Sequence, residues 1–164
     1  MPKRRRTATV PPGGWTPEKV ARRERALGRN PWGGGNHNSL GCEFFEMGLW
    51  ERAASEFEIA IEINPWRAVF KANLARAYVV LGRYDDAERA ARGALARDPK
   101  TSSAYFTLGL VCEAQGRLEE AADWYRICLA SAPSIVIRHD VQEDLELVLS
   151  KLEKQRKGRQ SHHG

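Results

Sequence analysis

The sequence predicts an all-α protein built from stacked helical hairpins, and three observations support this prediction. Four residue types recur with a period of 34 residues, which is typical of a helical hairpin that stacks on copies of itself. Apolar residues within each period lie three and four positions apart, as on one face of an α-helix. A glycine and a proline divide each period into two helices. The recurring residues are Leu40, Leu74 and Leu108; Gly48, Gly82 and Gly116; Ala53, Ala87 and Ala121; and Pro65, Pro99 and Pro133.

The N-terminal part of the chain comprises two segments. Residues 1–15 are rich in arginine, proline and glycine, and we expect this arm to be disordered. Residues 16–33 contain a helix that starts at Thr16-Pro17-Glu18 and continues to about residue 27, because threonine and proline favour a helix start. The tripeptide Asn30-Pro31-Trp32 recurs 34 residues later as Asn64-Pro65-Trp66. This helix is therefore interpreted as the second half of a degenerate repeat that covers one end of the stack.

Three full repeats follow, over residues 34–67, 68–101 and 102–135. We expect residues 33–39, with the sequence GGGNHNS, to be a flexible hinge before the first helix. Small residues in each hairpin let its two helices approach closely, and an added side chain there would cost roughly 1–3 kcal/mol through overpacking. These small residues are Gly41, Ala75 and Gly109 in the first helices and Ala53, Ala87 and Ala121 in the second helices.

The period is lost after Pro133, and the rest of the chain is interpreted as a cap. Residues 136–157 contain a helix that begins near Asp140, because Asp140 and Glu143 have the spacing of a capping pair. One apolar stripe of this helix would cover the last repeat while its other side stays polar, as in the capping helix of a solenoid. Residues 158–164 form a basic tail.

Length, composition and cysteine count narrow the class of protein. The chain has 164 residues, enough for one domain with a buried core. Its basic N-terminus lacks the apolar stretch of a secretory signal, and no apolar run is long enough to span a bilayer. The cysteines Cys42, Cys112 and Cys128 form no CxxC pair, so neither a disulfide framework nor a zinc site is indicated. We therefore expect a soluble cytoplasmic protein with free thiols.

The net charge of +5 is unevenly distributed. Residues 1–31 carry +7, residues 151–164 carry +4, and the segment between them carries −6. Basic ends suggest an anionic partner such as RNA, DNA or a membrane surface. Alternatively, they are solvated tails that keep an acidic body soluble or fold back on it. The candidate anion-contacting residues of the arm are Lys3, Arg4, Arg5 and Arg6.

The repeated pattern resembles that of the tetratricopeptide repeat (TPR) family. The family's leucine, glycine and aromatic positions appear as Leu40-Gly41-x-x-Phe44, Leu74-Ala75-x-x-Tyr78 and Leu108-Gly109-x-x-Cys112. Its later alanine and aromatic positions appear as Ala53-x3-Phe57, Ala87-x3-Ala91 and Ala121-x3-Tyr125. The sequence departs from the family at the tryptophan position, which carries His37 and Lys71. The resemblance implies a right-handed α-solenoid in which the first helix of each hairpin lines a concave groove.

By this resemblance, the non-core positions of the first helices would bind a partner in the concave groove. Many of these positions are apolar, and exposed apolar patches usually mark interaction surfaces. Asn73 and Arg76 would anchor the backbone and a carboxylate of a bound peptide. The predicted groove residues are Asn38, Cys42, Phe45, Val69, Asn73, Arg76, Val79, Val80, Phe106, Leu110 and Glu113.

TPR proteins that grip the acidic C-terminus of a chaperone use a clamp of lysine, asparagine and arginine side chains. Of the corresponding positions here, only Asn73 carries the family's residue, so we expect an apolar or amphipathic partner segment instead of an acidic C-terminal one. An alternative is that residues 1–37 of the same chain cover the groove. The clamp positions are Asn38, Cys42, Asn73, Ser103 and Phe106.

No arrangement of residues in the sequence indicates catalysis, a metal site or a cofactor. The glycine-rich stretch 33–37 follows no strand and lacks the lysine of a phosphate-binding loop. The pair His162-His163 has no third ligand. Cys112 and Cys128 are predicted to lie in the core, whereas Cys42 is predicted to face the groove and to be reactive.

Two classes of function follow from these observations. The first is a non-enzymatic scaffold, adaptor or assembly factor that binds an apolar helical or extended segment of a protein partner, as a subunit of a larger complex. The second is a nucleic-acid- or ribosome-associated protein whose basic ends contact phosphates, with a strong dependence on salt. Neither class requires a small-molecule substrate or a membrane span.

Overall fold

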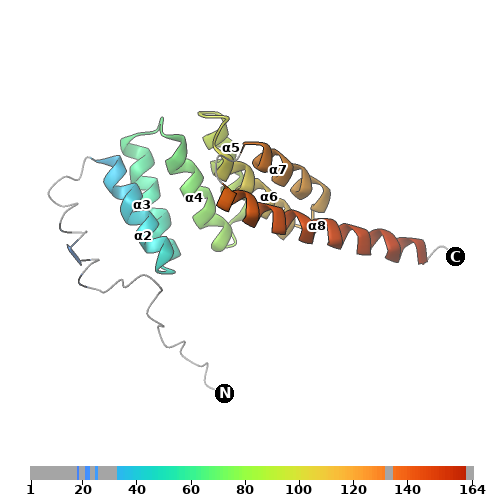
Figure 1. Ribbon diagram of the computed structural model, residues 1–164. Coiled ribbons are helices and arrows are strands. Elements are labelled where there is room, and N and C mark those ends of the chain that lie inside the picture. The colour runs from blue at the N-terminus through green and yellow to red at the C-terminus, as the bar shows by residue number, and fades with distance from the viewer. Residues whose placement is uncertain (1–17, 19–20, 23–24, 26–32, 132–134, 162–164) are drawn as a thin grey trace, which may run out of the picture.

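The computed structural model describes residues 18, 21–22, 25, 33–131 and 135–161. Over residues 33–131 and 135–161 the chain forms seven helices and no strand. Six of them pair into three hairpins, and a seventh helix follows the last hairpin (Figure 1). The helices are α2 (Gly34–Glu46), α3 (Trp50–Ile63), α4 (Ala68–Val80), α5 (Tyr84–Leu95), α6 (Ser102–Ala114), α7 (Leu118–Ser131) and α8 (Ile135–Ser161).

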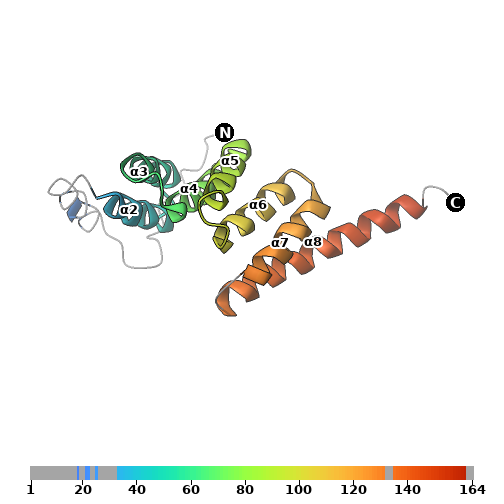
Figure 2. The ribbon, with the colours of Figure 1, turned by 90° about the horizontal axis from the view of Figure 1, so that it is seen from above.

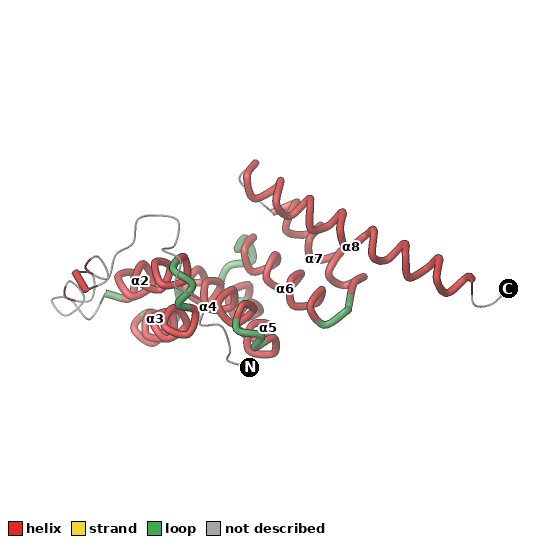
Figure 3. The backbone as a smooth tube through the Cα atoms, turned by 90° about the horizontal axis from the view of Figure 1, so that it is seen from below, coloured by secondary structure: helices red, strands yellow, loops and turns green. Residues whose placement is uncertain are grey.

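The hairpins stack side by side, and their first helices form one row. Figures 2 and 3 view the stack from opposite sides, and both place α3 and α5 on one side of the row formed by α2, α4 and α6. The first helix of the middle hairpin, α4, contacts the first helices of both neighbouring hairpins, α2 and α6. This arrangement confirms the all-α solenoid of helical hairpins.

Close approach within the hairpins depends on two buried glycines of the first helices. A Cβ atom on Gly41 would lie 2.6 Å from Cε1 of Phe57, and a Cβ atom on Gly109 would overlap the ring of Tyr125. Phe57 and Tyr125 are 1% and 0% exposed, so neither ring has space into which it can withdraw. A residue without a side chain is therefore needed where each aromatic ring crosses the first helix.

Three equivalent glycines end the first helices. Gly48, Gly82 and Gly116 have φ angles of 74°, 73° and 75°, in the left-handed region that a Cβ atom disfavours. In the first hairpin, the backbone N–H of Leu49 donates to the carbonyl oxygen of Phe44 at 2.9 Å. This bond across the glycine closes the helix end and turns the chain into the second helix.

The structure contradicts the hinge predicted for residues 33–39, because this stretch is helical from Gly34 onward. Glycine disfavours helix when a segment is considered alone, but packing outweighs that preference here. A Cβ atom on Gly34 would lie 3.0 Å from the carbonyl oxygen of Ala60, so its absence lets α2 approach α3. In the same turns, His37 Nδ1 lies 2.7 Å from Glu56 Oε2.

The C-terminal helix is longer than predicted at both ends. Helix α8 begins at Ile135 and ends at Ser161, so Asp140 and Glu143 lie within the helix and do not open it. A four-residue apolar stripe packs this helix onto the last hairpin, and its C-terminal part extends beyond the other helices (Figure 1). The stripe comprises Val141, Leu145, Val148 and Leu152.

The N-terminal predictions fall mostly outside the described residues. Of the helix predicted from about residue 17 to 27, Glu18, Ala21, Arg22 and Arg25 are described, and all four are helical. The arm of residues 1–15 lies outside the described part of the chain. None of the helices that the structure describes is long and apolar enough to cross a membrane.

Candidate partner-binding groove

One stripe of α4 carries four of the predicted groove residues. Val69, Asn73, Arg76 and Val80 are separated by four, three and four positions, which places them on one side of the helix. Val69 and Val80 are each 43% exposed, and Arg76 is exposed between them. The stripe therefore presents two accessible apolar ends and a polar centre.

The polar centre of this stripe is joined to α2 by side-chain hydrogen bonds. The Asn73 amide donates to Oδ1 of Asn38 at 2.9 Å and to Sγ of Cys42 at 3.6 Å. All three side chains are half-buried. These contacts fix the orientation of the Asn73 amide at the surface between the first two hairpins.

A cavity of about 110 Å³ lies at the same junction of α2 and α4. The guanidinium carbon of Arg76 lies 4.8 Å from the centre of the Phe45 ring, within the range of a cation–π contact. This contact holds a positive charge beside the cavity. The cavity is lined by Cys42, Phe45, Glu46, Phe57, Asn73 and Arg76.

Cys42 lines this cavity, and its surroundings favour the protonated thiol. Burial, as the largest cause, raises the pKa of Cys42 above its ordinary value of 9.0, and the attraction of Arg76 only partly offsets it. A thiol is a weaker nucleophile than a thiolate, so the raised pKa disfavours the reactivity expected of Cys42. Cys112 and Cys128 are buried, as predicted.

Three other predicted groove residues are packed more deeply. Val79 packs against the core of the first two hairpins, and Phe106 and Leu110 pack against the core shared by the last hairpin and α8. The rings of Phe106 and Tyr125 lie 5.8 Å apart between centres. These three side chains therefore contribute to the core and are less accessible than Val69 and Val80.

Glu113, also predicted to line the groove, bonds with two neighbouring helices. Its Oε2 accepts a hydrogen bond from the Tyr125 hydroxyl at 3.0 Å, and its Oε1 lies 2.6 Å from Nζ of Lys151 in α8. Lys151 is not one of the residues that the sequence predicts for the site. No signal in the sequence could have identified it, because the position of α8 against α6 is a property of the tertiary packing.

The predicted site residues therefore form two groups. Those on α2 and α4 meet around Asn73 and Arg76, whereas those on α6 attach to α7 and α8. The candidate anion-contacting residues Lys3, Arg4, Arg5 and Arg6 lie outside the described residues. Within the described part of the chain, no group of three or more histidine, cysteine or acidic side chains is arranged to hold a metal ion.

The stacked helical hairpins define a helical-repeat protein of the solenoid class. Residues 72–134 of the chain match the family model of the tetratricopeptide repeat. The chain is 36% identical over 77 residues to the small glutamine-rich tetratricopeptide repeat-containing protein 2 of Saccharomyces cerevisiae. That match covers 47% of this chain and 22% of the yeast protein, so the chain spans about a fifth of this relative.

Two solved structures illustrate the similarity in fold. The Sgt2 TPR domain from Aspergillus fumigatus aligns with a TM-score of 0.68 and 23% identity, over 77% of this chain and 83% of that domain. The second TPR domain of human RPAP3, in complex with the HSP70 peptide SGPTIEEVD, aligns with a TM-score of 0.60 and 26% identity. The latter alignment covers 68% of this chain and 91% of the human domain.

Proposed function

We propose that this chain is a non-enzymatic adaptor that holds an apolar helical or extended segment of a protein partner against the exposed stripe of α4. The observation that carries the proposal is the exposure of Val69 and Val80, 43% each, on both sides of Asn73 and Arg76. A partner's apolar side chains would bury the valines, at about 25 cal/mol for each Å² removed from water. The oriented amide of Asn73 and the guanidinium of Arg76 would bond with the partner's backbone and with a carboxylate.

The complex of the human RPAP3 domain supports the proposal that this chain binds a segment of another protein. The residues of this chain do not favour an acidic peptide like the one in that complex. That complex contains an acidic HSP70 peptide, SGPTIEEVD. In the present chain, the last two clamp positions carry the uncharged residues Ser103 and Phe106, and the Phe106 ring packs against Tyr125. Two carboxylates of an acidic peptide would have no cationic partner at these positions.

The groove is tested by replacing the two exposed valines. A Val69→Glu/Val80→Glu variant places charges on the accessible surface without entering the core, unlike changes at the packed residues Val79 and Phe106. A matched control, Ile59→Glu/Ile127→Glu, adds the same charges at positions that are 37% and 41% exposed on α3 and α7.

The measurement is affinity capture of partners from cell lysate, with and without nuclease. We expect a discrete protein that is retained by wild type and by the control, is absent with the valine variant and is unaffected by nuclease. Equal capture by the valine variant and the wild type would contradict the proposed groove.

Peptide specificity needs a separate titration. We expect no saturable binding when the peptide SGPTIEEVD is titrated into this chain and the heat of binding is measured by calorimetry. Saturable binding that the valine variant retains would contradict the apolar specificity while leaving the adaptor function intact.

A second candidate function is nucleic-acid binding, favoured by the basic end of α8. Lys154, Arg156, Lys157 and Arg159 are all exposed in the C-terminal part of α8. A Lys154→Ala/Lys157→Ala/Arg159→Ala variant tests this function with a random-sequence DNA duplex as the probe. If the basic end binds phosphates, the slope of log affinity against log salt falls by about 0.9 for each phosphate that the variant no longer neutralises. An unchanged slope would exclude the contribution of this helix end.

A further inference from the structure

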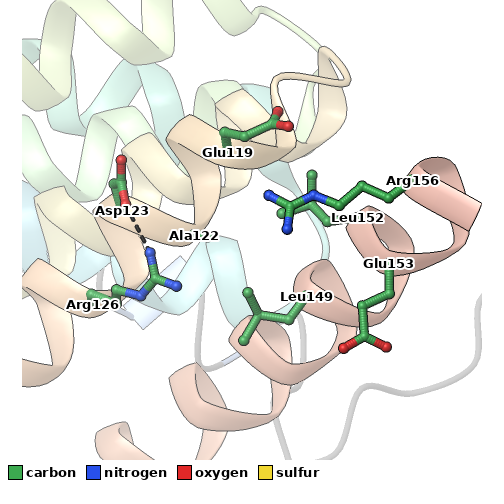
Figure 4. A pocket seen from close by; sticks show the side chains of 8 residues that line it. All are labelled: Glu119, Ala122, Asp123, Arg126, Leu149, Leu152, Glu153 and Arg156. Carbon is green, nitrogen blue, oxygen red and sulfur yellow. Dashed lines mark hydrogen bonds and ion pairs between the residues drawn. The ribbon is translucent and has the colours of Figure 1, made fainter.

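A second cavity, of about 390 Å³, lies between α7 and α8 and is separate from the groove on α4. Figure 4 shows side chains of the two helices facing each other across it. Its floor includes Ala122 and Leu152, which are 2% and 7% exposed, and its rim is charged. We call this cavity the α7–α8 notch; it is lined by Glu119, Ala122, Asp123, Arg126, Leu149, Leu152, Glu153 and Arg156.

The notch lies on the side of α8 that points away from the groove. Lys151 bonds with Glu113 of α6, which identifies the side of α8 that faces the row of first helices. Leu149, Glu153 and Arg156 lie on the other side of the buried stripe, as the helical period requires.

Helix α8 occupies the position of the first helix of a fourth hairpin. It packs on α7 as α6 packs on α5 and as α4 packs on α3. The second helix of the last hairpin also meets the second helix of the hairpin before it, because Arg92 of α5 lies 5.8 Å from the ring of Trp124 in α7. The notch is therefore the place where the second helix of a fourth hairpin would pack, and α8 is the last helix that the structure describes.

The N-terminal segment of the chain is the complementary piece. By the 34-residue period, residues 16–29 correspond to the second helix of a hairpin, α3, and their described members, such as Arg22 and Arg25, are helical. This segment directly precedes α2, which lies at the opposite end of the stack from α8 (Figure 1). The segment that would fill the notch therefore belongs to a second copy of the chain.

The charges of the segment and of the notch rim are complementary. Residues 16–29 contain five basic and two acidic residues. On the rim, Arg126 is already paired with Asp123 at 2.9 Å. Glu119 and Glu153 are exposed there and form no ion pair among the described residues, so they are available to basic side chains. Arg156 is the other basic residue of the rim, and with it the rim keeps a net charge of −1.

We propose that the N-terminal helix of one copy packs into the α7–α8 notch of a second copy and completes a fourth hairpin across the two chains. Such an interface is heterologous, since the notch and the segment are different surfaces of the same chain. Heterologous contacts that do not close into a ring add further copies, so assembly should increase with concentration without stopping at a dimer.

The first test is the molar mass of the full chain by light scattering over a wide range of concentration. We expect the mass to rise above the 18.5 kDa of one chain. Glu119→Lys should weaken this association by about tenfold, because a like charge then faces the basic segment. The matched control is Asp85→Lys, the residue 34 positions earlier at the same place in α5, and it should associate as the wild type does.

The second test is charge exchange between two variants. Glu119→Lys/Glu153→Lys alters the notch and Arg22→Glu/Arg25→Glu alters the segment, so each alone should remain near the mass of one chain. Their mixture should associate, because each altered surface then meets one of opposite charge. Circular dichroism melting curves like that of the wild type establish that both variants are folded.

Three results would overturn the proposal. They are a wild type that stays monomeric at every concentration, a Glu119→Lys variant that associates like its control, and two charge variants that do not recombine. A monomeric wild type would leave the notch to a helix of a different protein.

Discussion

Nζ of Lys151 lies 2.6 Å from Oε1 of Glu113, and this ion pair joins α8 to α6. The Tyr125 hydroxyl of α7 donates to the other carboxylate oxygen at 3.0 Å. One carboxylate therefore connects the three last helices, on the side opposite the α7–α8 notch. The capping helix is held by this polar contact as well as by its buried apolar stripe.

Loss of the ion pair should lower the stability of the last hairpin modestly. Because the Lys151 side chain is 43% exposed, we expect Lys151→Met to lower the free energy of unfolding by about 0.5–1 kcal/mol. Urea denaturation of Lys151→Met, Glu113→Gln and the double variant measures the coupling between the two residues. Lys154→Met is the control on the same helix, and an equal loss in both lysine variants would show that the ion pair contributes nothing.

The two helical glycines Gly109 and Gly158 should respond to alanine in opposite directions. Gly109→Ala places a methyl group against the buried Tyr125 ring, so we expect a loss of about 1–3 kcal/mol in unfolding free energy. At Gly158 a Cβ atom meets nothing within 4 Å, so alanine should raise helix stability by about 0.5–1 kcal/mol. Thermal denaturation of both variants measures these changes in stability. Equal shifts of the melting temperature would contradict the close packing at Gly109.

The carboxyl group of Asp144 should destabilise the fold at neutral pH. Burial, followed by repulsion from Glu113, raises the pKa of Asp144 above its ordinary 3.8. The stability linked to this group is therefore present below pH 3.8 and is lost as the pH rises through the raised value. We expect Asp144→Asn to be more stable than wild type by about 0.5 kcal/mol at neutral pH, given its partial exposure.

Urea denaturation over a series of pH values measures this difference, which should narrow as the solution becomes acidic. Glu153→Gln, an exposed change on the same helix, is the control. A constant difference between Asp144→Asn and wild type at all pH values would contradict the linkage.

The three thiols should differ in reactivity in the folded protein. Burial raises the pKa of Cys128 to about 11 and also raises that of Cys112, so neither should react with a thiol reagent at neutral pH. Cys42 is half-buried and its pKa is raised, so it should react first but more slowly than an unfolded cysteine. Mass spectrometry with and without urea measures these rates, and fast labelling of native Cys42 would contradict the raised pKa of this half-buried thiol.

The period of 34 residues is sufficient to predict the hairpins and part of the site. Each hairpin needs the same turn between its two helices, so Gly48, Gly82 and Gly116 recur where a helix must end with positive φ. Helical spacing likewise identifies the stripe that contains Val69 and Val80. These features depend on contacts that repeat along the chain, so the residues that make the contacts also repeat in the sequence.

Features that occur only once in the molecule cannot be predicted from the repeat. The glycine-rich start of α2 suggests a hinge because glycine disfavours an isolated helix, yet the Cβ-free approach of Gly34 to α3 makes it helical. The capping spacing of Asp140 and Glu143 suggests a helix start, but nothing between Ile135 and these residues interrupts α8.

The sequence by itself determined the helical hairpins, their number, their boundaries at glycine and proline, and the resemblance to the TPR family. Only the tertiary structure decided which predicted groove residues remain accessible, because the exposure of Val80 and the partial burial of Phe106 depend on how neighbouring helices cover them. It also decided the pairing of Lys151 with Glu113 and the open notch beside α8. Local patterns specify helices through short-range backbone geometry, whereas the contacts between helices depend on the distances and angles at which distant segments pack.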